Sequence, residues 1–148
     1  MLFLLQLLVG SFLISVTVII HIMGIVGLIR LLSSWAPRLG PRTSYLGMLE
    51  ILIMTVVALF LLHTLEIWAW AIFYMAIGEF ADLHRALYFS TVTFSTLGYG
   101  DITLTDRWNL VSSFEAVNGV ILFGISTAFV FAVIQKIYAA VAKGDGKP

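Results

Sequence analysis

The sequence contains no cysteine and few charged residues, and both shortages restrict what the protein can be. Without cysteine the chain can form neither a disulfide framework nor a thiolate metal site. Its eight basic and eight acidic side chains make up only 11% of the 148 residues and balance to a net charge of zero. Because a neutral chain offers no basic surface to phosphates, we expect no nucleic-acid partner.

Hydrophobic residues make up 61% of the chain, and the mean hydropathy is +1.06. Soluble domains contain about 45–50% apolar residues. Three apolar runs, at residues 2–32, 45–77 and 108–141, exceed the roughly 20 residues that cross a bilayer core. The first run is longer than the apolar part of a signal peptide and no basic segment precedes it, so we expect a retained helix. The sequence therefore predicts an all-α integral membrane protein with three transmembrane helices.

The distribution of basic residues predicts the orientation, because cytoplasmic loops are enriched in Lys and Arg. One group lies at and after the end of the first run, and the other lies at the C-terminal end of the chain. The first loop and the C-terminus are therefore expected in the cytoplasm, with the N-terminus and residues 78–107 outside. The residues of the two groups are Arg30, Arg38, Arg42, Lys136, Lys143 and Lys147.

Residues 78–107 are mixed in polarity and do not form a crossing. Asp82 is a good N-cap for a short helix that extends to about Ser95, where a glycine-rich segment follows. A short helix and a glycine-rich return form a re-entrant loop, which membranes tolerate where the backbone is buried in protein or lines water.

The segment after the short helix reads Thr96, Leu97, Gly98, Tyr99, Gly100 and Asp101. Glycine adopts backbone angles that direct successive carbonyls to one side. Rings of such carbonyls replace the water shell of K⁺ in selectivity filters, and the negative end of a helix favours a cation nearby. One loop supplies a quarter of each ring, so four copies are expected.

This motif lies between two predicted membrane helices, and in that position it resembles the filter of the potassium channel family, specifically of its small prokaryotic members with one pore loop per chain. The resemblance covers residues 45–142, about two-thirds of the chain. It implies K⁺ sites at Thr96, Leu97, Gly98 and Tyr99, with Gly100 completing the filter. Leu97 stands where Val or Ile is commoner in that family, and Ser95 stands where Thr is common. The expected filter supports are Asp101, Ser95, Tyr88 and Phe89.

The resemblance implies a homotetramer in a lipid bilayer, in the inner membrane of a prokaryotic cell. It divides the chain into an additional helix and cytoplasmic loop at 1–44, a pore domain at 45–142 and a short cytoplasmic tail at 143–148. We expect K⁺ as the permeant ion, no cofactor, no fused ligand-binding domain and no enzymatic activity. A less selective cation channel, a transporter subunit and a non-conducting accessory protein are the alternatives.

Two glycines in the last helix, Gly119 and Gly124, are candidates for a bend that opens the cytoplasmic mouth. The alternative is that they allow close packing with another helix. The sequence does not distinguish between these interpretations.

Ionisable residues inside a membrane are costly, so His63, Glu66 and Glu115 are expected to face protein. His63 and Glu66 are three residues apart and share a helical face. We expect the three residues to form a buried polar network behind the pore loop, with a proton-sensitive gate as an alternative. The pair of His63 and Glu66 can also be half of a metal site, although no second motif in the sequence completes it. His21 is expected to form a hydrogen bond between helices.

Overall fold

The computed structural model describes residues 1–35 and 45–144, and their regular structure is entirely helical. The four helices are α1 (Leu2–Trp35), α2 (Tyr45–Ala76), α3 (Leu83–Phe94) and α4 (Asn109–Gly144). Arg38, Arg42 and Lys147, which entered the orientation argument, lie outside the described residues, as do most of the predicted tail and the end of the first loop.

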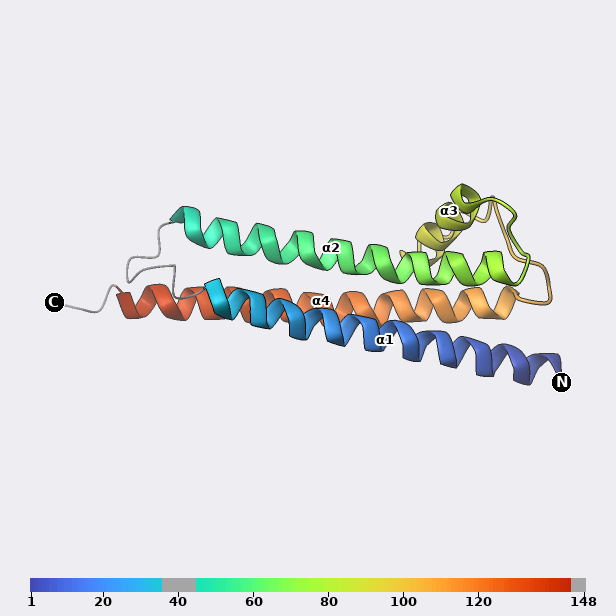
Figure 1. Ribbon diagram of the computed structural model, residues 1–148, viewed down its shortest axis with the longest axis horizontal. Helices are drawn as coiled ribbons and strands as arrows, with labels where there is room; N and C mark the ends of the chain where they lie inside the picture. The colour runs from blue at the N-terminus through green and yellow to red at the C-terminus, as the bar shows by residue number, and fades with distance from the viewer. Residues whose placement is uncertain (36–44, 145–148) are drawn as a thin grey trace.

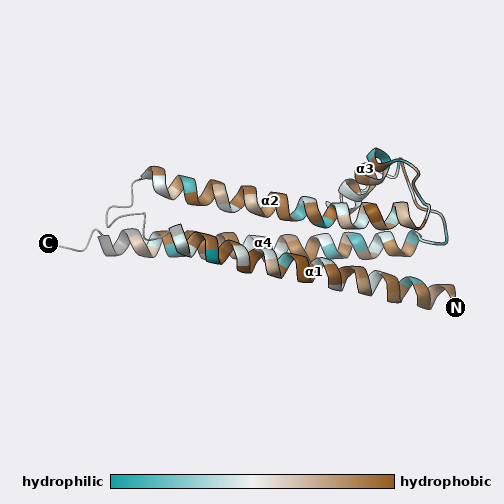
Figure 2. Ribbon diagram, viewed as in Figure 1, coloured by the Kyte–Doolittle hydropathy of each residue, from teal (hydrophilic) through white to brown (hydrophobic). Residues whose placement is uncertain are grey.

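Three of the helices are long enough to cross a membrane. Helices α1, α2 and α4 contain 34, 32 and 36 residues, so each is about 50 Å long at 1.5 Å per residue. Their candidate spans are Leu2–Ser34, Tyr45–Ala76 and Asn109–Ala140, and all three are predominantly hydrophobic (Figure 2). The prediction of an all-α membrane protein with three transmembrane helices is therefore confirmed.

The long helices lie side by side, and the short helix α3 lies at one end of them (Figure 1). Helix α2 runs antiparallel to α1 and α4, and α1 packs against both. The N-terminus and the start of α4 lie at the α3 end, whereas the last turns of α4 lie at the opposite end. This arrangement places the pore-loop segment and the N-terminus at the same end of the bundle.

Capping residues set the two ends of α3. The side chain of Asp82 accepts a hydrogen bond from the backbone N–H of Arg85 at 3.0 Å, which satisfies a donor that the first turn leaves free. At the other end, Ser95 N–H donates to the Thr91 carbonyl, and Thr96 N–H donates to the Thr93 carbonyl. The helix thus begins and ends where the sequence predicts.

An aromatic core holds α3 against α2 and α4. Trp70 and Tyr74 of α2, together with Phe94 of α3, are fully buried. Phe89 lies edge to face with Tyr74 at 5.3 Å. Aromatic pairs of this kind contribute beyond their buried area, so the core fixes the position of the short helix.

The packing of α1 was not predictable from the sequence. Gly10 lies against the ring of Phe114, and the Asn118 amide donates to the Thr17 hydroxyl at 2.7 Å. The Gln6 amide also donates to the backbone carbonyl of Arg107. These contacts join the first half of α1 to α4 and to the turn that precedes it.

Candidate functional site

In the return segment, residues 96–100, the backbone angle φ alternates between positive and negative values. Thr96, Gly98 and Gly100 have φ values of +59°, +54° and +74°. Leu97 and Tyr99 between them have negative φ, since Thr96 is the only non-glycine residue with positive φ among the described residues. A backbone that alternates between right- and left-handed angles turns successive peptide groups the same way. The two glycines therefore have the angles that the sequence predicts.

Hydrogen bonds anchor the start of this segment to the end of α3. The backbone N–H groups of Leu97 and Gly98 both donate to the Val92 carbonyl, at 3.0 and 3.1 Å. The Ser95 hydroxyl donates to the Thr91 carbonyl at 2.7 Å, a bond within the last turn of α3. The return segment thus begins directly at the negative end of the helix dipole.

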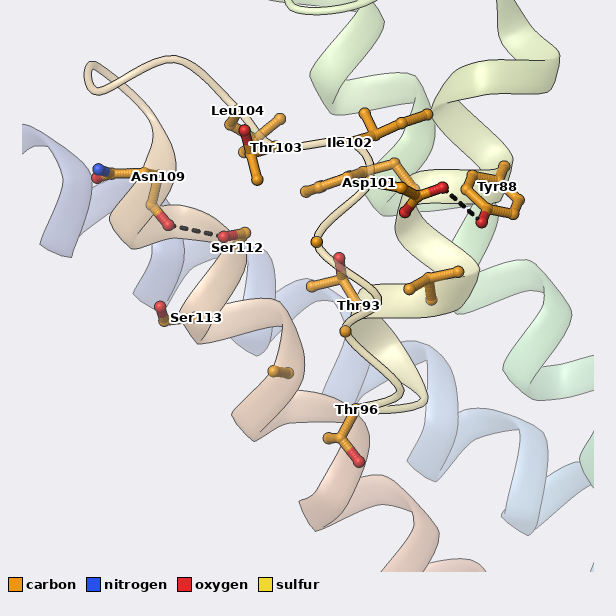
Figure 3. A pocket seen from close by; sticks show the side chains of 15 residues that line it. Tyr88, Thr93, Thr96, Asp101, Ile102, Thr103, Leu104, Asn109, Ser112 and Ser113 are labelled. Atoms are coloured by element: carbon orange, nitrogen blue, oxygen red, sulfur yellow. Dashed lines mark hydrogen bonds between the residues drawn. The ribbon is translucent and has the colours of Figure 1, made fainter.

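A groove of about 360 Å³ separates the return segment from the first turns of α4 (Figure 3). Thr93 and Thr96 lie on one side, and Asn109, Ser112 and Ser113 lie on α4. The side chains of Leu97 and Tyr99 point away from the chain's own core, since they are 55% and 66% exposed. They are available for contact with another molecule.

Tyr88 and Phe89, both expected to support the return segment, make different contacts. The Tyr88 hydroxyl donates to the Asp101 carboxylate at 2.8 Å (Figure 3). This hydrogen bond raises the pKa of Tyr88 above its ordinary value. Phe89 is buried in the aromatic core against Tyr74 and Phe80. Tyr88 therefore contacts the residue that follows Gly100, and Phe89 holds α3 in the aromatic core.

A second link across the pore loop was not anticipated from the sequence. The Glu79 carboxylate, just after α2, accepts hydrogen bonds from the Thr105 backbone N–H at 2.9 Å and from the Thr105 hydroxyl at 2.6 Å. These residues are 26 positions apart and no spacing rule pairs them. The contact joins the two ends of the loop that carries α3 and the return segment.

The two candidate bend glycines have different surroundings. A Cβ on Gly119 would overlap the backbone carbonyl of Phe94 at the end of α3, whereas a Cβ on Gly124 would meet nothing within 4 Å. The structure therefore gives Gly119 the close-packing role. Gly124 keeps the bend as a possible role.

A polar cluster joins three helices in the interior of the bundle. The Glu66 carboxylate of α2 lies 2.7 Å from His21 Nδ1 of α1 and 2.8 Å from His63 Nδ1 of its own helix. The Ser126 hydroxyl of α4 lies 2.9 Å from His63 Nε2. His21 and Glu66 are completely buried. His21 thus makes the interhelical hydrogen bond expected of it.

Glu115 lies in a separate cluster, which corrects the expectation of one network. The Tyr74 hydroxyl donates to Glu115 at 2.8 Å, and among the described residues no hydrogen bond connects Glu115 to His63 or Glu66. Tyr74 follows Glu66 by eight residues, so its level on α2 is about 12 Å away. That distance is too great for a shared hydrogen bond.

The two clusters should contribute independently to stability. Glu66→Gln and Glu115→Gln are each expected to lower the free energy of unfolding by about 1–3 kcal/mol, because each weakens the hydrogen bonding of a buried group. Groups more than about 7–10 Å apart with no shared partner add within about 0.5 kcal/mol. Denaturant unfolding of the two single variants and the double variant measures this sum.

The pair Tyr74→Phe and Glu115→Gln is the matched control, because these side chains share one hydrogen bond. Their effects should combine to less than the sum of the two. A coupling between Glu66 and Glu115 as large as the coupling in this control would show that the clusters are connected.

Comparison with known proteins agrees with these features. A family model described as Ion channel matches residues 60–136, which are 77 of the 148 residues. The matched segment begins within α2, contains α3 and the return segment, and ends within α4. No curated protein and no solved structure matched the chain. Because the family model covers more than half of the chain, including the whole pore-loop segment, this integral membrane protein belongs to the ion channel family.

Proposed function

We propose that this ion channel subunit is selective for potassium and that four copies surround one conduction axis. The observation that carries the proposal is the alternation of positive and negative φ along residues 96–100, directly after α3. Membership in the ion channel family favours passive transport over enzymatic catalysis. In the proposed assembly, residues 45–142 are the pore domain, and α1 packs on its outside.

The alternating backbone supports dehydration of a cation. When successive carbonyls face one side, four copies of the segment supply stacked oxygen rings that replace the hydration shell of K⁺. The rings would lie at Thr96, Leu97, Gly98 and Tyr99, with the Thr96 hydroxyl adding the innermost oxygens. Thr96 itself has a strained backbone, because a positive φ in a β-branched residue costs about 1–3 kcal/mol, and such strain concentrates at functional sites.

The charges around the segment favour a cation. The C-terminal end of α3 carries a partial negative charge and lies next to Thr96. The fifteen residues that line the groove include the Asp101 carboxylate and no basic side chain. An anion would therefore meet unfavourable charge in the same place.

Four-fold assembly follows from the single loop in each chain. A closed ring with cyclic symmetry completes every oxygen ring without another kind of subunit. The exposed Leu97 and Tyr99 side chains and the groove beside them are then covered by neighbouring copies. Native mass measurement should give four copies, and a purified protein that forms only dimers would contradict the four-loop pore.

Potassium flux out of liposomes tests the proposal. Vesicles that contain the purified protein and are loaded with potassium should release K⁺ down its gradient without an energy source, and the same vesicles loaded with sodium should release Na⁺ much more slowly. A non-conducting accessory protein would release neither ion, and a less selective channel would release both at similar rates.

The hydrogen bond between Tyr88 and Asp101 should stabilise the conducting filter. Tyr88→Phe is expected to increase the decline of K⁺ flux with time, because Asp101 loses its hydroxyl donor. The pKa of Tyr88 is raised, so the bond is complete below a pH of about 10 and is lost as pH rises through the raised value. The variant should therefore lack the alkaline loss of flux that is expected of the unmodified protein.

Tyr138→Phe is the matched control, because Tyr138 is an exposed residue near the other end of α4. It should leave the time course of K⁺ flux unchanged. Equal time courses for the Tyr88 variant and the unmodified protein would exclude a supporting role for this hydrogen bond.

A further inference from the structure

Three metal-ligating side chains meet in the interior of the bundle where α1 and α2 pack together. His21, His63 and Glu66 each offer one ligand atom, and these atoms all lie within 4.8 Å of one another. The two imidazole rings are stacked, with centroids 5.3 Å apart and planes at 28°, and both direct Nδ1 at the Glu66 carboxylate. We propose that these residues form a binding site for a d-block divalent cation such as Zn²⁺.

The donor set selects the class of cation. Two imidazole nitrogens and one carboxylate oxygen suit Zn²⁺ and similar transition metals, whereas Mg²⁺ and Ca²⁺ prefer all-oxygen sites. Ligand atoms about 2.0–2.1 Å from a tetrahedral Zn²⁺ lie about 3.3 Å from one another. The present contacts of 2.7 and 2.8 Å between nitrogen and carboxylate therefore have to open by about 0.5 Å when a cation enters.

Ser126 completes the site from α4. Its hydroxyl oxygen lies 2.9 Å from His63 Nε2 and 3.4 Å from His21 Nε2. When a cation is bound to both Nδ1 atoms, each neutral ring carries its proton on Nε2. The Ser126 hydroxyl oxygen has two lone pairs, so it can accept a hydrogen bond from each of the two N–H groups. Ligating histidines commonly donate their second N–H to such an acceptor, which fixes the orientation of the ring.

The surroundings give the site both shielding and a path of entry. His21 and Glu66 are fully buried, so a cation there would lose most of its water shell, and one water that enters from the His63 side would supply the fourth ligand. A groove of about 520 Å³ between α2 and α4 reaches the site, since His63 and Ser126 both line it. The His63 side chain is 12% exposed and is the point of access.

The site lies next to the pore loop. The His63 ring is 6.0 Å from the ring of Phe94, the last residue of α3, and 4.8 Å from that of Phe123 on α4. A cation held by His21 and Glu66 also ties α1, which the family model does not include, to α2. Binding of the cation would thus stabilise the contact of α1 with the ion-conducting part of the chain.

Zinc binding to the purified full chain tests the proposal independently of conduction. The protein in detergent is freed of metal with a chelator, equilibrated with Zn²⁺ and separated from unbound ion, and the bound zinc is counted by elemental analysis. We expect one Zn²⁺ per chain. Co²⁺ at the same site should give the strong visible absorption of a four-coordinate ion, which hydrated Co²⁺ lacks.

Variants assign the bound ion to these residues. His21→Gln and His63→Gln should each weaken Zn²⁺ binding by more than about 100-fold, and Ser126→Ala should weaken it by about 10- to 100-fold. His84→Gln is the matched control, because His84 is the third and last histidine and is exposed at the start of α3. It should bind zinc like the unmodified protein.

Three results would overturn the proposal. They are failure of the unmodified protein to bind Zn²⁺, unchanged affinity in both His21→Gln and His63→Gln, and loss of binding in His84→Gln alone. Ser126→Ala retains all three ligands, so zinc binding by this variant still tests the site if a histidine variant fails to fold. Unchanged zinc affinity and an unchanged Co²⁺ spectrum in that variant would remove Ser126 from the site and contradict the proposed geometry.

Discussion

Gly98→Ala and Gly100→Ala are each expected to abolish potassium flux while the protein still inserts into the membrane. Both glycines have positive φ, at which a Cβ costs about 1–2 kcal/mol. Nothing lies within 4 Å of the added Cβ at either position, so the effect arises from the backbone angle and not from a clash. Relaxation to negative φ would rotate a carbonyl away from the ion path. Flux into liposomes and the amount of protein in the membrane fraction measure the two effects.

Gly78→Ala is the matched control for this strain. Gly78, just after α2, has φ of +82° and also has nothing within 4 Å of an added Cβ. The substitution should lower stability by about the same 1–2 kcal/mol but leave potassium flux intact. If all three variants conducted equally well, residues 96–100 would not be the filter.

The second large effect is expected from Gly119→Ala, which should destabilise the protein and stop conduction. The added methyl group would overlap the Phe94 carbonyl at the end of α3. Because Phe94 is fully buried, the carbonyl can move only if α3 or α4 shifts, and such overpacking costs about 1–3 kcal/mol. The shift would also displace Ser95 and Thr96. Denaturant unfolding and liposome flux measure both consequences.

Gly124→Ala provides the comparison on the same helix. It meets no atom within 4 Å, and alanine is a better helix former than glycine by about 0.5–1 kcal/mol. We expect this variant to be as stable as the unmodified protein or more stable. Reduced channel opening in Gly124→Ala would assign the bend to this glycine, whereas normal stability and flux in Gly119→Ala would contradict the close contact with Phe94.

The helices and the pore loop were predictable because their signals are local in the sequence. Long apolar runs define α1, α2 and α4, and Asp82 and Ser95 mark the ends of α3. The need for positive φ at Gly98 and Gly100 was also evident, since glycine is the residue that adopts it most easily.

Contacts between distant residues were not predictable. Apolar residues occur on every side of α1, so hydrophobic periodicity does not indicate which side packs against the pore domain. His21 and Glu66 are 45 residues apart and are brought together only when α1 and α2 pack. The same holds for Ser126, 105 residues from His21, and these are the residues that complete the cluster begun by His63 and Glu66.

Glu115 shows the opposite error. The sequence grouped it with His63 and Glu66 because all three are ionisable residues within membrane helices. That shared property does not determine the partner, and the donor to Glu115 is the hydroxyl of Tyr74, about two turns farther along α2 than Glu66.

The reversal potential under bi-ionic conditions tests potassium selectivity most directly. With the purified protein in a planar bilayer, K⁺ on one side and Na⁺ at the same concentration on the other, the current should reverse far from zero, at a voltage that makes the K⁺ side strongly negative. Four aligned carbonyl segments would produce this result, because they replace the hydration shell of K⁺. A reversal potential near zero would show that both ions pass equally well and would contradict a potassium-selective filter at residues 96–100.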